Sequence, residues 1–104
     1  MEIQRSRLES IKIGEYGFSD KELPILALIK HHLSTSETAN KQIEKALSSE
    51  AGLANLVEEA KEAAVDISGD LKFRLFLSMV DGKKVAEKYW TALKPFLQDC
   101  GKEV

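Results

Sequence analysis

The residues best suited to catalytic chemistry are few and lie far apart in this sequence. Cys100 is the only thiol, and the two histidines, His31 and His32, are adjacent to each other in a different segment. Covalent catalysis needs a nucleophile beside a base and an orienting group. Neighbouring helical residues point about 100° apart, whereas histidines that share a metal ion on a helix are usually four positions apart. We therefore expect one histidine to face the interior and the other the solvent, and we expect no enzyme active site.

Charged side chains form two regularly spaced groups. Glu58, Glu62 and Asp66 recur every four positions along one side of a helix, and Lys84 and Lys88 repeat that spacing with the opposite charge. Like charges four residues apart destabilise a helix by about 0.2–0.5 kcal/mol per pair unless an opposite charge offsets them. We therefore expect the two groups to face each other or a charged partner, with a plain solvated surface as the alternative. These five residues are the candidate partner-binding set.

The composition narrows the class of protein further. The chain has 104 residues, of which 43% are hydrophobic, and its 15 basic and 17 acidic residues give a net charge of −2. These values are typical of one globular domain, residues 1–104, with about 13 N-terminal and about five C-terminal residues peripheral or frayed. The near-neutral charge argues against nucleic-acid binding, which needs clustered cations.

The sequence predicts neither a membrane span nor a secretion signal. Its longest apolar run, Leu23–Ile29, is far shorter than the ~20 residues that cross a bilayer. The first residues lead into mixed charges and not into an apolar signal core. A single thiol precludes an internal disulfide and fits a reducing compartment, so we expect a cytoplasmic protein.

The spacing of apolar residues predicts an all-α compact bundle of about five helices. The clearest amphipathic helix spans 53–67, and the segment 23–33 is apolar nearly all round, which is typical of a central, buried helix. Ser19 and Glu22 form a candidate capping box for that buried helix, although Pro24 favours a start closer to Glu22.

Two further helices are less sharply defined. Ser34 and Glu37 form a second candidate capping box, which predicts a short helix over 34–47. Leu71–Val80 alternates like a strand, yet it contains enough apolar residues for a buried helix. Because its neighbours are helical, we favour the helix.

The two ends of the chain are expected to contribute least to the bundle. A short amphipathic helix is predicted near residues 3–11, followed by a turn at Gly14 and Gly17. A last helix, starting near residue 83, is expected to end or kink at Pro95, which leaves Cys100 in a frayed tail. The expected core consists of Leu26, Ile29, Leu33, Leu56, Val57, Phe73, Phe76, Leu77, Trp90 and Leu93.

One motif recurs at two predicted helix starts. Glycine precedes glutamate by five positions in Gly17–Glu22 and again in Gly82–Glu87, where Asp81 comes first. A carboxylate near the positive end of a helix dipole explains this spacing without any function. The Asp-Gly-x-x-x-x-Glu pattern also resembles the helix starts of the tellurite-resistance TerB-like family. That resemblance implies an all-helical fold in two pseudo-repeated halves, a place in a stress-response assembly, and Ca²⁺ or another divalent cation bound by Asp81, Glu87 and Glu22.

The sequence thus favours a binding protein over an enzyme. Our leading hypothesis is a small cytoplasmic interaction module, such as an adaptor, immunity, inhibitor or accessory protein. It would contact another protein, or a second copy of itself, through a charged helix face. The alternative is a TerB-like metal-responsive helical domain.

Overall fold

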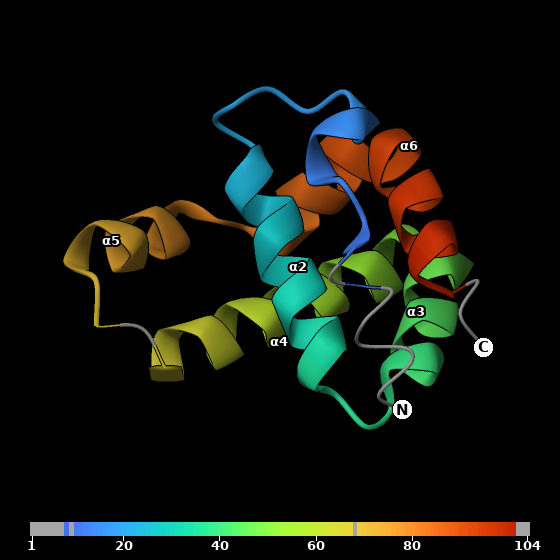
Figure 1. Ribbon diagram of the computed structural model, residues 1–104, viewed down its shortest axis with the longest axis horizontal. Helices are drawn as coiled ribbons and strands as arrows, with labels where there is room; N and C mark the ends of the chain where they lie inside the picture. Colours follow the sequence, from blue (N-terminus) through green and yellow to red (C-terminus); the bar gives the residue numbers. More distant parts are fainter. Residues whose placement is uncertain (1–7, 9, 68, 102–104) are drawn as a thin grey trace.

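Five α-helices account for most of the described chain, which comprises residues 8, 10–67 and 69–101 of this computed structural model. The elements are η1 (a 3-10 helix, Ile13–Tyr16), α2 (Leu23–Thr35), α3 (Ala39–Ser48), α4 (Glu50–Ile67), α5 (Leu71–Met79) and α6 (Gly82–Gly101). Figure 1 shows α2, α3, α4 and α6 gathered into one body, while α5 extends to one side beyond the end of α4. The expected all-α bundle, including a helical α5, is confirmed.

Backbone hydrogen bonds, and not a capping side chain, lead the chain into α2. The amides of Glu22 and Leu23 both donate to the Ser19 carbonyl, at 2.9 and 3.1 Å, and no side-chain cap bond forms at Glu22. Pro24 lies in the first turn, where its missing amide costs no helical hydrogen bond. The capping box at Ser19 is therefore wrong, and the alternative start beside Glu22 is confirmed.

The second predicted capping box is also wrong, because α2 continues past it. Ser34 lies in the last turn of α2, where its hydroxyl donates to the His31 carbonyl at 2.8 Å, and α3 begins only at Ala39. The break between α3 and α4 falls at Ser49. The Ser49 hydroxyl accepts a hydrogen bond of 3.0 Å from the Gly52 amide and so caps α4.

α6 continues through Pro95 to Gly101, so the predicted end at the proline and the frayed tail at Cys100 are both wrong. Pro95 is exposed, whereas Phe96, Leu97 and Cys100 are fully buried. Burial of a large apolar side chain contributes about 1.5–3 kcal/mol. Two such side chains therefore offset the ~3 kcal/mol cost of a proline inside a helix.

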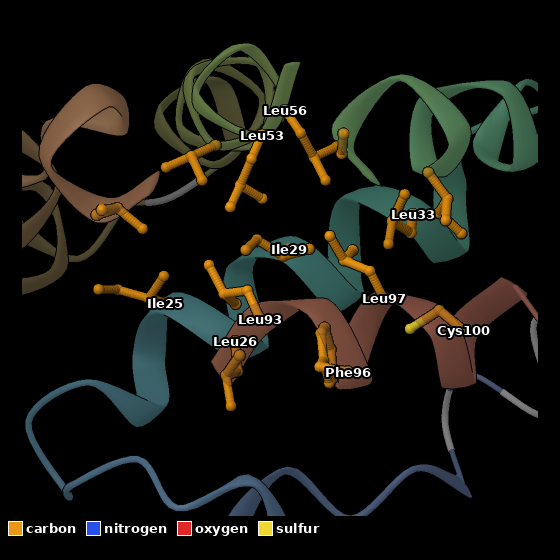
Figure 2. Close-up of a cluster of buried hydrophobic side chains, with 14 of the residues drawn as sticks. Ile25, Leu26, Ile29, Leu33, Leu53, Leu56, Leu93, Phe96, Leu97 and Cys100 are labelled. Atoms are coloured by element: carbon orange, nitrogen blue, oxygen red, sulfur yellow. The ribbon is translucent and has the colours of Figure 1, made fainter. Parts of the chain in front are cut away.

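The main core lies where α2, α4 and α6 meet, and α3 and Leu8 add to it. Figure 2 shows Ile29, Leu53 and Leu93, one from each of these three helices, pointing toward one another. The predicted core residues that are buried are Leu26, Ile29, Leu33, Leu56, Val57, Leu77 and Leu93, while Phe73, Phe76 and Trp90 are half-buried. The predicted core omits the buried residues Leu53, Phe96, Leu97 and Cys100.

Two glycines allow close approach between helix backbones. A Cβ at Gly52 would lie 2.0 Å from the Lys45 carbonyl oxygen of α3, and a Cβ at Gly82 would lie 2.5 Å from the Ala54 carbonyl oxygen of α4. The α3–α4 and α4–α6 contacts therefore depend on glycine. α5 packs instead through a second, smaller cluster, formed by Leu28, Ala60, Ala64 and Leu77.

The N-terminal segment is described only in part. The helix predicted over 3–11 falls mostly on residues 1–7 and 9, outside the described residues, although Leu8 is buried in the core. The predicted turn is present, because η1 ends at Gly17 with a φ of 78° that favours glycine. Within the described ranges, none of the helices combines the length and the hydropathy needed to span a membrane.

Candidate functional site

The three acidic residues that the family resemblance assigns to a metal ion lie in different surroundings. Asp81 caps α6, because its Oδ1 accepts hydrogen bonds of 3.0 and 3.4 Å from two amides of the first turn. Glu22 accepts a hydrogen bond of 2.5 Å from the Tyr89 hydroxyl, and Glu87 is exposed. Among the residues described, no group of three or more His, Cys, Asp or Glu side chains is placed to hold a metal ion. Metal binding by these residues stays a prediction of the resemblance.

The histidines and the thiol also have local explanations. His31 is exposed, while His32 is half-buried with its Nε2 3.8 Å from a carboxylate oxygen of Glu59, as the adjacent spacing predicts. Burial raises the pKa of the Cys100 thiol to about 12. A thiol with this pKa is protonated at neutral pH and is a poor nucleophile.

The acidic and basic groups expected to face each other are engaged elsewhere. Glu58 accepts a hydrogen bond of 3.1 Å from the Gly82 amide and lies 3.8 Å from the Lys61 amine, so it joins α4 to the start of α6. Lys88 pairs at 3.9 Å with Glu22, the N-cap residue of α2, and not with an acid of α4. Two members of the candidate partner-binding set thus have contacts within the fold.

Of the other three members, Glu62 and Asp66 lie four residues apart on the same side of α4, and Lys84 lies elsewhere. Glu62 lines a polar groove of about 670 Å³ between α3 and α4, opposite Lys41 and Lys45 of α3. Asp66 is exposed near the end of α4. Lys84 lines a different hollow, beside α5. The structure therefore does not bring the five residues into one charged face.

The most exposed large apolar side chains of the described chain form a line along α5. Leu71, Leu75 and Met79 are 75%, 67% and 82% exposed, and their four-residue spacing places them on one side of the helix. The opposite side of α5 carries the buried Leu77 and the half-buried Phe73, which pack on α4. We call Leu71, Leu75 and Met79 the α5 stripe.

The α5 stripe leads into a hollow of about 260 Å³ where the start of α2, the end of α5 and the start of α6 meet. Met79 belongs to both features, and the apolar lining also includes Ile25, Phe76, Val80 and Val85. The charged side chains around this lining are Lys21, Glu22, Asp81, Lys84 and Lys88. We call this feature the lysine-rimmed hollow.

A small hydrogen-bonded cluster fixes one wall of the lysine-rimmed hollow. Glu22 accepts from the Tyr89 hydroxyl, and the Lys88 amine lies 5.0 Å from the centre of the Tyr89 ring. Burial and the bond to Glu22 both raise the pKa of Tyr89, so the phenol stays protonated at neutral pH. One oxygen of the Glu22 carboxylate is therefore held by the half-buried Tyr89 and by the exposed Lys88.

The exposure of the α5 stripe was not predicted from the sequence. Six of the nine residues of α5 are Leu, Phe or Met, and a helix that is apolar nearly all round usually lies in a core. The signal that could have revealed the stripe is its position opposite Phe73 and Leu77. A nine-residue helix next to one neighbour can bury only one of its sides.

Comparisons with known proteins identify no relatives. No protein family matches the chain, and the searches of curated proteins and of solved structures find no match either.

Proposed function

We propose that this chain is a small protein-interaction module that binds its partner through the α5 stripe. The observation that carries the proposal is the exposure of three large apolar side chains on a helix that projects from the bundle. Apolar patches exposed in this way are typical of interaction sites, because leaving them in water is unfavourable. A reducing compartment such as the cytoplasm suits the single, buried thiol.

This proposal moves the predicted contact surface from the charged side of α4 to α5. Glu58 is occupied by the Gly82 amide and by Lys61. Exposed ion pairs contribute little to binding or stability, typically about 0–1 kcal/mol. Buried apolar anchors at the centre of an interface contribute more, often about 2 kcal/mol or more each.

A native pull-down with three variants tests the proposal. The bait is the full chain, and the compared variants are Leu75→Glu on the α5 stripe, Glu62→Lys on α4, and Thr91→Glu as a control at an exposed position of α6. We expect the partner recovered with the wild type to be lost with L75E and kept with T91E and E62K. All variants should keep the wild-type melting curve, because exposed substitutions usually change stability by less than about 0.5 kcal/mol.

The opposite pattern would contradict the proposal. A partner that L75E retains and E62K loses would place the contact on the acidic side of α4, as the charge spacing predicts. Failure to recover any partner with the wild-type bait would remove the support for an interaction module.

A further inference from the structure

The α5 stripe and the lysine-rimmed hollow form one continuous surface, because Met79 belongs to both. The stripe from Leu71 to Met79 covers eight helical steps, or about 12 Å. The hollow extends this apolar surface past Phe76 toward Ile25 and Val85. The combined surface is long and narrow, which suits a helix laid along it.

The charge of this surface is opposite to that of the whole chain. The charged residues of α5 are Lys72 and Arg74, and Lys21 and Lys84 stand at the hollow. Neither Lys21 nor Lys84 forms an ion pair with another described residue. The net charge of the chain is −2, so this apolar surface is locally cationic on an acidic protein.

The acidic groups at the hollow are already engaged. Glu22 is held through its Oε1 by Tyr89 and Lys88, while its buried Oε2 accepts no hydrogen bond from any described residue, and Asp81 caps the first turn of α6. Lys83 and Lys84 occupy that same first turn, where the helix dipole makes cations unfavourable. An incoming carboxylate would relieve this repulsion, since it would be attracted both to the lysines and to the positive end of α6.

We infer that this surface binds an acidic amphipathic helix of a partner protein, an inference that rests on the proposed function. The apolar side of the helix would cover Leu75 and Met79 and enter the hollow, and its flanking carboxylates would pair with Lys21 and Lys84. A second copy of this chain fits less well. A second copy would present the same cationic surface, so it would lack the carboxylates that pair with Lys21 and Lys84.

Two synthetic peptides test the inference by fluorescence anisotropy. Both have about four helical turns and the same leucine-rich apolar side, but one carries glutamates beside it and the other carries lysines. They are titrated with the wild-type chain, with a Lys21→Glu/Lys84→Glu variant, and with a Lys41→Glu/Lys45→Glu control. The control makes the same change in net charge on α3, which lies away from α5 in Figure 1.

We expect the glutamate peptide to bind the wild type about tenfold more tightly than the lysine peptide, as two or three exposed ion pairs would give. Raising the salt from ~0.05 to ~0.5 M should reduce this preference through screening. K21E/K84E should reverse the preference, while K41E/K45E should keep it. L75E should weaken binding of both peptides.

Several outcomes would overturn the inference. These are equal binding of the two peptides, binding of neither, or the same loss of preference in K41E/K45E as in K21E/K84E. Sedimentation with anionic vesicles that K21E/K84E abolishes would assign the surface to lipid, and a wild-type dimer that L75E dissociates would assign it to a second copy. If the native partner is lost with L75E but kept with K21E/K84E, only the acidic helix is excluded and the proposed function stands.

Discussion

Leucines in two regions of this molecule have opposite environments. Leu53 of α4 and Leu93 of α6 are fully buried in the bundle, whereas Leu71 and Leu75 of α5 are 75% and 67% exposed. All four belong to helices whose apolar residues follow helical spacing. The bundle helices have neighbours on several sides, whereas α5 packs through one side on α4 and on Leu28 of α2. The number of surrounding helices, and not the residue type, therefore decides which leucines are buried.

The largest loss of stability should come from truncating a buried leucine of the bundle. We expect Leu93→Ala to lower the free energy of unfolding by about 2–5 kcal/mol, because it removes a fully buried side chain and leaves a cavity. Urea denaturation monitored by circular dichroism measures the loss. A loss smaller than that of an exposed leucine would show that the bundle is not the stable part of the fold.

The second largest effect should come from adding a side chain where two helix backbones lie close together, compared with a position that has open space around it. Gly52→Ala should destabilise the protein by about 1–3 kcal/mol, because its Cβ would overlap the Lys45 carbonyl and force α3 from α4. Gly69→Ala, between α4 and α5, is the control, since nothing lies within 4 Å of a Cβ there. Thermal melts of the two variants should differ in this direction, and equal melts would refute the close α3–α4 approach.

The pH dependence of stability tests whether Cys100 is buried at the C-terminal end of the bundle. Burial raises the pKa of Cys100 from an ordinary value near 9.0 to about 12. The folded state thus favours the protonated thiol. The contribution of this protonated thiol to the free energy of unfolding is complete below about pH 9 and is lost as the pH rises toward 12. The slope for one such group is at most about 1.4 kcal/mol per pH unit.

Urea unfolding between about pH 8 and 10.5 should therefore show a steeper loss of stability for the wild type than for Cys100→Ala. Tyr16 also has a raised pKa, mainly through burial and its bond to Asp99 and in smaller part through Cys100. The contributions of burial and Asp99 are present in both proteins and cancel in the difference. If stability fell equally steeply with pH in the two proteins, the thiol would be exposed to water, which would contradict its burial in α6.

The smallest effect belongs to α5. Leu75→Ala should change the free energy of unfolding by less than about 0.5 kcal/mol, because the side chain is 67% exposed. L93A, measured in the same denaturation experiment, is the matched comparison, because both variants truncate a leucine to alanine and differ in its burial. A loss close to that of L93A would mean that α5 is covered within the isolated protein.

The sequence predicted the elements whose spacing was strong and local. The helical character of α4 follows from its apolar periodicity, and that of α2, with the burial of Leu26, Ile29 and Leu33, follows from its nearly continuous apolar surface. The segment of α5 alternates like a strand, and its helix was favoured because its neighbours are helical. The end of α6 could not be predicted in this way. The local penalty of Pro95 is outweighed by the burial of Phe96 and Leu97, which depends on contacts with distant parts of the chain.

The candidate site was less accessible to sequence reasoning than the fold. The pairing of Lys88 with Glu22 joins α6 to α2, and the hydrogen bond from Gly82 to Glu58 joins α6 to α4. Such partners are set by tertiary packing and leave no periodic signal. The segment that forms α5 was predicted to be a buried helix, although Leu71, Leu75 and Met79 were not among the predicted core residues. An apolar residue gives no indication of whether another helix will cover it.

The separate small cluster under α5 has a consequence for how the protein opens. Leu77 packs with Ala60, Ala64 and Leu28 apart from the main core, although Phe76 also packs against that core. We therefore expect α5 to detach while the bundle stays folded, so that the molecule has two cooperative units of unequal stability. Amide hydrogens of α5 should exchange through a local opening, and those of α2, α4 and α6 only on global unfolding. Occupancy of α5 by a partner would appear first as slower exchange in that one helix.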